Sequence, residues 1–262
     1  MSNAILCQVK RAENPYYIRE VDLRIYSVEE LCFFIDKNLP LVDEEFFSEE
    51  LIDWLAKELK LRRLVQTMER IRQEEPDNAV AGQILAVNQE LSWLYAGDKE
   101  KLKRNIEEVF ALPILERRVR RADILVGYQK YAKAIEAYKA ILADGKVENP
   151  GQILTGRIYH NTGIAYSRLF QFDEASSCLK KAYDLLHTLE SLKDYLYCLW
   201  ISGGKEEFTN ACREYEVDAK TRREMEEELE SFDSEAGQEE EEDVTEDTLN
   251  TLVREYHRQT GC

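Results

Sequence analysis

The sequence predicts an all-α fold, built as a helical solenoid in which antiparallel helix pairs stack side by side. Glycine and proline are scarce, at 11 and 5 of 262 residues, and Glu, Leu, Lys, Arg and Ala dominate, which favours helix over sheet. From residue 76 onward, amphipathic helical patterns follow one another with short breaks between them. Two of these pairs are similar in sequence, and internal similarity of this kind is typical of stacked helix pairs.

Residues 1–75 are expected to form a small N-terminal cap or domain. Ile5–Val9 and a second strand within Tyr16–Tyr26 are predicted to form a β-hairpin. Ser27 is predicted to start a helix, because Glu30 stands at the capping-box position. The other helices of this region are expected at Ser48–Leu59 and Leu61–Glu75.

The repeated helix pairs are expected between residues 76 and 222. Their helices are predicted at Ala79–Tyr95, Lys99–Ala111, Glu116–Gly127, Tyr131–Ala143, the two halves of Tyr159–Leu186, Ser191–Ser202 and Lys205–Asp218. Gly203-Gly204 is expected to turn the chain within the last pair. A last helix, Lys220–Glu230, is expected to lead out of the stack.

The internal repeat is clearest between Tyr131–Lys139 and Phe172–Lys180, where Ala134 aligns with Ala175. The two alanines are 41 residues apart, about seven more than the 34-residue period of one class of helical repeat. The loop Asp144–Gly156 contains Gly and Pro residues and is predicted to hold the surplus.

Small and aromatic residues recur within the stretch Tyr159–Leu186 at fixed positions: Tyr159, Gly163, Tyr166, Phe172, Ala175 and Ala182. The pattern resembles the tetratricopeptide repeat, with Thr162, Leu179 and Thr188 as departures from it. The preceding pair keeps Ala122, Tyr131, Ala134 and Tyr138, and the flanking pairs match by helix rhythm only. The resemblance implies close helix contact at Gly163 and Ala175, where a larger side chain would push the helices apart.

The same resemblance implies a non-enzymatic adaptor or scaffold that binds a peptide or partner protein on the concave face, which the first helix of each pair lines. By analogy, the exposed groove residues are Arg120, Asp123, Arg157, His160, Asn161, Ile164 and Arg168, together with Val119. Arginines in such a groove suit a carboxylate or an acidic segment. The alternative is that these arginines are solvated or pair with neighbouring acids.

The net charge of −17 is concentrated near the C-terminus, because Glu224–Asp247 holds 14 acids and no base and leaves about −3 for the rest. We expect residues 223–245 to be an acidic linker without a fold. The densest basic cluster, Glu116–Arg121, could meet an acidic partner or the protein's own tail. One hypothesis is that Glu224–Asp247 folds back on a basic groove and competes with a ligand; the alternative is a linker that only solubilises. Residues 246–262 are expected to form a short helix that docks on the body, caps it or docks on another protein, with Leu249, Leu252, Val253 and Tyr256 on one face.

Several functional classes are not expected. The chain lacks phosphate-binding, dinucleotide-binding, nucleophile-elbow and zinc-protease motifs, so we expect no catalytic residues and no cofactor. The six cysteines form no C-x-x-C, and the three histidines are far apart, which predicts no metal site. The near-neutral body argues against nucleic acid, and no long apolar run predicts a membrane span. We expect a cytoplasmic protein.

Two alternatives to a plain adaptor remain. One is a chaperone-like factor for a secreted or assembled partner. The other is a peptide-sensing regulator, in which residues 1–75 would have to supply a helix-turn-helix, although their helices are acidic or interrupted at Asn38-Leu39-Pro40.

Overall fold

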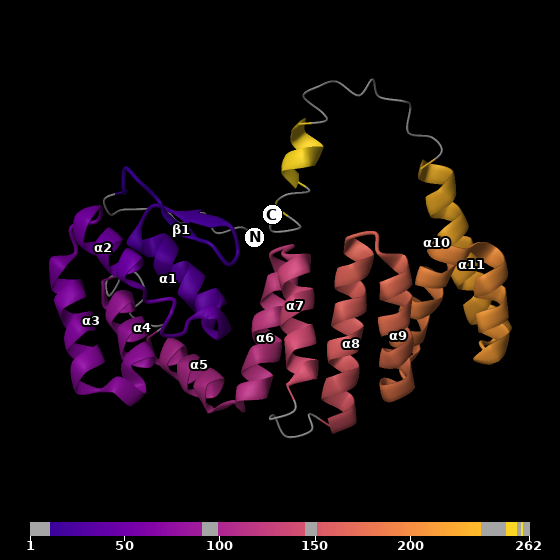
Figure 1. Cartoon of the computed structure of the whole chain (residues 1–262), viewed down its shortest axis with the longest axis horizontal. Coiled ribbons are helices and arrows are strands. Elements are labelled where there is room, and N and C mark those ends of the chain that lie inside the picture. Colours follow the sequence, from indigo (N-terminus) through magenta and orange to yellow (C-terminus); the bar gives the residue numbers. More distant parts are fainter. Residues whose placement is uncertain (1–10, 91–98, 145–150, 237–249, 256–257, 259–262) are drawn as a thin grey trace. The chain divides into compact units, whose positions relative to one another are not determined.

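The computed structural model describes residues 11–90, 99–144, 151–236, 250–255 and 258 (Figure 1). Helices make up nearly all of its regular structure, which confirms the all-α prediction. The chain divides into two compact units, residues 1–124 and 125–262, and each is described by itself. Among the described residues, no helix combines the length and apolar character that a membrane span needs.

The first unit begins with a small antiparallel hairpin. Strand β1 (Tyr16–Ile18) pairs with strand β2 (Leu23–Ile25), and Tyr16 lies opposite Ile25. Both strands therefore lie inside the stretch that was expected to be a single strand, which corrects that prediction. The reason is Asp22, whose left-handed φ of 55° helps to turn the chain back on itself. The strand expected at Ile5–Val9 lies outside the described residues.

Helices follow the hairpin in the first unit, and two of them start at the predicted caps. Ser27 caps α1 by accepting a hydrogen bond from the backbone N–H of Glu30, and Ser48 caps α2 in the same way. The helices are α1 (Val28–Lys37), α2 (Glu49–Lys57), α3 (Arg62–Glu74), α4 (Ala79–Gln89), α5 (Lys99–Ala111) and α6 (Ile114–Gly127), with 3₁₀ turns at Leu39–Leu41 and Pro76–Asn78.

The core of this unit brings α4 together with α3 and α1. The Cys32 thiol of α1 donates to the carbonyl oxygen of Val87 in α4 at 3.6 Å, and both residues are buried. Because α4 completes this core, the boundary expected after residue 75 falls within the first compact unit, which ends at Ile124. The two units thus meet in sequence inside α6.

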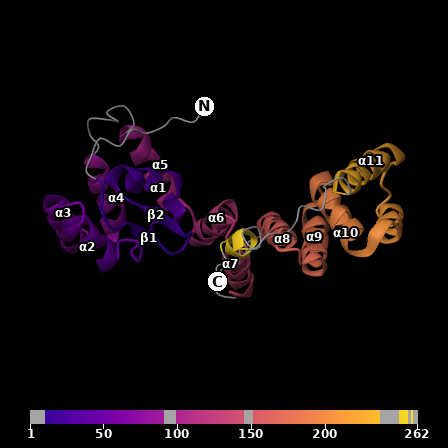
Figure 2. The ribbon, with the colours of Figure 1, turned by 90° about the horizontal axis from the view of Figure 1, so that it is seen from above.

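The second unit is a row of antiparallel helices that lie side by side in both views (Figures 1 and 2). Its helices are α7 (Tyr131–Ala143), α8 (Gly151–Arg168), α9 (Phe172–Leu186), α10 (Leu189–Glu214) and α11 (Ala219–Ala236). Helix α9 packs against α8 and α10, and α7 packs against α8. Helix α10 breaks at Gly204, whose φ is 81°, so that it forms two helices as predicted.

Two boundaries in this unit differ from expectation. Helix α8 begins at Gly151, within the stretch that was expected to be loop to residue 156. Helix α11 continues to Ala236, so the first part of the expected acidic linker is helical. Buried Met225 and Leu229 anchor it to the core, and an ion pair at helical spacing between Arg222 and Glu226, 2.9 Å apart, supports it.

The C-terminal segment is described only in part. Residues 250–255 are helical, and Leu252 and Val253 are exposed. Residues 237–247 of the segment that was hypothesised to fold back on the body lie outside the described residues, as do Leu249 and Tyr256 of the expected C-terminal helix.

Candidate functional site

The α8–α9 hairpin is the centre of the second unit, and a close helix contact shapes it. A Cβ atom on Gly163 would lie 2.6 Å from Leu179 Cγ and 3.2 Å from the carbonyl oxygen of Ala175. A larger residue therefore has no room at position 163 unless the helices shift. Phe170, with a left-handed φ of 59°, helps to turn the chain, and the N–H of Gln171 closes the turn onto the Tyr166 carbonyl at 3.0 Å.

The positions predicted to be structural lie mostly in the core. Gly163 and Tyr166 are buried, whereas Tyr159 and Phe172 are half-buried. The fully or nearly fully buried positions are Ala122, Tyr131, Ala134, Tyr138, Ala175 and Ala182. Leu179, which replaces an aromatic residue of the expected pattern, is also fully buried. Of these positions, Gly163 is the one at which an added Cβ would meet the facing helix.

Helix α8 presents two opposite sides. Tyr159, Thr162 and Tyr166 are spaced by three and four residues and share one side. The predicted groove residues on the other side follow the same spacing; we call this side the front face, and it consists of Arg157, His160, Asn161, Ile164 and Arg168. Arg157 and Arg168 are exposed, and the other three are half-buried.

An ion pair connects the front face to the next helix of the row. His160 Nε2 lies 2.7 Å from Asp194 Oδ2 of α10, and both side chains are largely buried. The hydrogen bond to Asp194 is the main reason that the pKa of His160 is raised, although burial opposes the shift. The front face therefore extends from α8 onto the first part of α10.

Helix α10 continues this surface toward α11. The Tyr197 hydroxyl donates to Glu228 Oε2 of α11 at 2.6 Å. Ile201 follows Asp194 by seven residues and Tyr197 by four, so it lies on the same side of α10, and it is 54% exposed. Sequence reasoning had placed no residue of α10 on this surface. The helical spacing of the three residues is the signal that would have identified them.

The exposed arginines of the front face differ from Arg120 of α6 in their pairing. Arg157 and Arg168 form no ion pair or side-chain hydrogen bond with any residue that the structure describes. Arg120, by contrast, pairs with Glu116 at 3.3 Å. Of the predicted groove arginines, Arg120 is therefore the one that pairs with a neighbouring acid, as the alternative interpretation of the sequence expected.

The other predicted residues of α6 belong to the first unit and are described there. Val119 is buried, with 1% of its surface exposed, which contradicts its expected place in an exposed groove. Asp123 is half-buried. Arg121 holds two carboxylates: Nε and Nη2 donate to Glu20 at 2.9 and 2.8 Å, and Nη1 donates to Asp43 at 2.6 Å. Part of the basic cluster is thus already neutralised within the first unit.

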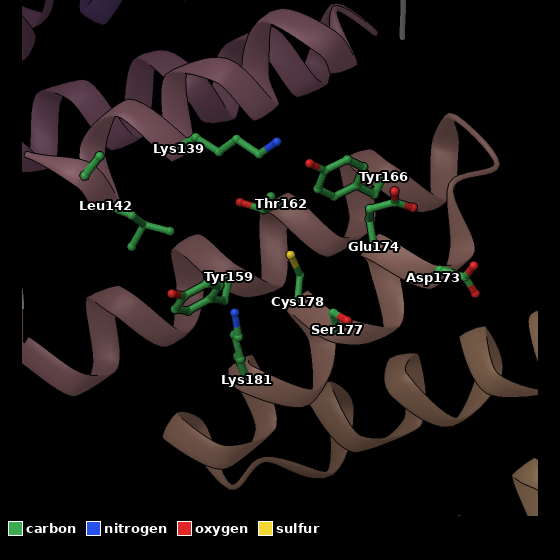
Figure 3. A pocket seen from close by; sticks show the side chains of 11 residues that line it. Lys139, Leu142, Tyr159, Thr162, Tyr166, Asp173, Glu174, Ser177, Cys178 and Lys181 are labelled. Atoms are coloured by element: carbon green, nitrogen blue, oxygen red, sulfur yellow. The ribbon is translucent and has the colours of Figure 1, made fainter.

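A pocket of about 600 Å³ lies on the other side of α8, between α7 and α9 (Figure 3). We call it the back pocket. Its walls include Lys139 and Leu142 of α7, Tyr159 and Tyr166 of α8, and Glu174, Cys178 and Lys181 of α9. Sequence reasoning had assigned the two tyrosines a structural role only and had not identified the lysines.

His160 and Cys178 lie on opposite sides of α8. His160 faces Asp194, whereas Cys178 lies in the back pocket on the other side of α8. Burial raises the pKa of the Cys178 thiol, which favours the neutral form. In the described part of the chain, no group of three His, Cys, Asp or Glu residues is arranged to hold a metal ion.

The helices from α6 to α9 are similar in sequence to a known repeat family. Residues 117–186, which run from α6 to the end of α9, match the family model of the tetratricopeptide repeat. This segment of the chain is a tetratricopeptide repeat region. The matched segment contains the α8–α9 hairpin in full. No curated protein and no solved structure significantly matches the chain. Tetratricopeptide repeats generally mediate protein–protein interactions and generally serve as non-catalytic scaffolds.

Proposed function

We propose that this tetratricopeptide repeat protein is a non-catalytic adaptor, which binds a peptide or a partner protein on the front face of its second unit. The observation that carries the proposal is the pair between His160 and Asp194, which joins α8 and α10 into one surface. A partner that contacts this surface touches two successive repeats at once, as ligands of stacked helix pairs do.

The chemistry of the front face favours a partner that combines acidic and apolar groups. Arg157 and Arg168 are exposed and lie eleven residues apart on α8, about 16 Å along the helix axis. Guanidinium groups bind carboxylates through paired hydrogen bonds. Ile164 and Ile201 supply apolar surface close to these charges. A helical or extended segment with acids on either side of an apolar residue matches this arrangement.

The proposal is tested by quantitative affinity capture from a native lysate, with the full-length chain as bait. We expect the double substitution Arg157→Glu and Arg168→Glu to remove the proteins that the wild-type chain enriches. The matched control is Arg213→Glu, which reverses the charge of an exposed arginine in the second half of α10. Circular dichroism verifies that the variants are folded. An identical set of captured proteins for all three baits would contradict the proposal.

A further inference from the structure

The back pocket carries two lysines that are placed over aromatic rings. Lys139 Nζ lies 5.3 Å from the centre of the Tyr166 ring, and Lys181 Nζ lies 5.3 Å from the centre of the Tyr159 ring. Figure 3 shows the two lysines on either side of the pocket, with Cys178 between them. The tyrosines thus hold each ammonium group near the opening by a cation–π contact.

Neither of these ammonium groups forms a salt bridge in the part of the chain that the structure describes, and Glu174 is only a lesser cause of the raised pKa of Lys139. Among the described residues, Lys139 and Lys181 form no ion pair with a carboxylate, although both are exposed. Elsewhere in the second unit, Lys205 pairs with Glu230 at 2.7 Å. The positive charge at the back pocket is therefore available to a ligand.

The charged groups around Cys178 indicate that the ligand of the back pocket carries negative charge. Burial is the largest influence on the pKa of the Cys178 thiol, and it raises this pKa. The charges of Lys181 and Lys139 lower the pKa, and each has a larger effect than Glu174, which raises it. Both ammonium groups therefore act on the same point at the floor of the pocket, and the local field there favours an anion. The thiol itself stays neutral and is part of the floor.

The size of the back pocket indicates a short extended peptide. Its wall on α9 runs from Asp173 to Lys181, nine residues that span about 12 Å of helix. An extended chain covers that length with about four residues. Leu142 and Tyr159 provide apolar surface near Lys181, while Asp173 and Glu174 border the other end (Figure 3). The two acids disfavour a uniformly anionic ligand such as a nucleic acid, whose repeated phosphates would meet them.

We propose that the back pocket binds an acidic peptide segment of a partner protein, with a carboxylate between Lys139 and Lys181 and an apolar side chain against Tyr159 and Leu142. The site goes beyond the proposed function, because it lies on the opposite side of α8 from the front face. The two surfaces can therefore be occupied independently.

The test uses the ¹⁵N-labelled full-length chain and a peptide of defined sequence, Gly-Leu-Glu-Asp-Leu-Gly, with blocked ends. Nuclear magnetic resonance titration is expected to shift the amide signals around Lys139, Cys178 and Lys181. The matched peptide Gly-Leu-Gln-Asn-Leu-Gly is expected to bind at least threefold more weakly. Equal shifts with both peptides, or no shift with either, would overturn the proposal.

Substitutions in the pocket locate the binding. Lys139→Gln together with Lys181→Gln is expected to weaken binding of the acidic peptide by about three- to tenfold, in line with two exposed charge contacts. Lys180→Gln is the matched control, because Lys180 lies on the same helix but interacts with Tyr215 and Tyr195. Unchanged affinity in the double variant would contradict the site. Arg157→Glu with Arg168→Glu is expected to leave unchanged the affinity that is read from the amide signals around Lys139, Cys178 and Lys181, so a failure here is separate from a failure of the front face.

A further variant decides between a partner and the chain's own acidic segment. Replacing Glu239, Glu240, Glu241 and Glu242 by Gln keeps the chain at full length. We expect the pocket signals of this variant and its affinity for the acidic peptide to match the wild type. If the peptide binds only after these replacements, the chain's own segment fills the pocket and the assignment to a partner is wrong.

Discussion

His160 Nε2 lies 2.7 Å from Asp194 Oδ2, and this pair joins α8, the first helix of the central hairpin, to α10, the helix that follows the hairpin. It is the contact through which α8 and α10 share one surface. Because histidine titrates near neutral pH, the strength of this connection varies with pH.

The first prediction concerns this pH dependence. Since the pKa of folded His160 is raised, mainly by the bond to Asp194, the pair stabilises the fold fully below the ordinary histidine value of about 6.5 and loses its contribution as pH rises through the raised value. Asp194→Asn should therefore cost about 1 kcal/mol at pH 6 and less at pH 8.5. Urea unfolding at both pH values measures the difference.

The control for this measurement is Asp184→Asn, which removes an exposed carboxylate from α9. The loss of unfolding free energy that this substitution causes is expected to be about the same at pH 6 and at pH 8.5. A cost of Asp194→Asn that is equal at both values, or larger at pH 8.5, would show that the pair does not titrate as described.

The second prediction concerns the close contact at Gly163. A Cβ at this position would lie 2.6 Å from Leu179 Cγ, so Gly163→Ala forces the α8–α9 hairpin to adjust. Overpacking costs about 1–3 kcal/mol, and the better helix propensity of alanine offsets about 1 kcal/mol of it. We expect a net loss of about 1–2 kcal/mol in the free energy of unfolding, measured by denaturant titration.

Gly127→Ala is the control, because a Cβ at Gly127 would meet no atom within 4 Å. It is expected to be neutral or slightly stabilising. If the two alanine variants are equally stable, the spacing between α8 and α9 does not depend on the absence of a side chain at position 163.

The third prediction concerns Arg121 in the first unit. This side chain holds Glu20 and Asp43 together through three hydrogen bonds, and it is partly buried. Arg121→Gln is expected to lower the free energy of unfolding by about 1–3 kcal/mol, because two carboxylates lose a shared partner. Thermal or denaturant unfolding measures the loss.

The adjacent Arg120→Gln provides the comparison, since Arg120 forms one exposed pair with Glu116 at helical spacing. Its loss is expected to cost about 0.5 kcal/mol or less. Similar effects at both positions would mean that the geometry at Arg121 contributes no more than an ordinary surface pair.

Sequence patterns identified what depends on local spacing. The caps Ser27 and Ser48, the break at Gly204 and the small residue Gly163 all act on neighbours within a few residues or on the adjacent helix. Such features leave a periodic or positional signal, which is why most helices of the second unit and the repeat class were predictable.

Features that depend on distant partners were missed. The helix that was expected to end at Glu230 continues to Ala236, because Met225 and Leu229 pack into the core. The β1–β2 hairpin depends on the left-handed backbone conformation of Asp22, which an alternating strand pattern does not predict. The back pocket needs Lys139 and Lys181 from two helices that are separated by α8 in the sequence. These features arise only once the chain is folded.

The most direct test of the account is site-specific photo-crosslinking in the native lysate. Benzoylphenylalanine at Ile201, exposed on the same side of α10 as Asp194, is compared with the same residue at Asp184, exposed on α9. We predict a crosslinked partner protein from position 201 but not from position 184, and its loss when Arg157 and Arg168 are both replaced by Glu. Crosslinks of equal yield from both positions, or crosslinks that persist after these replacements, would contradict a partner site on the front face.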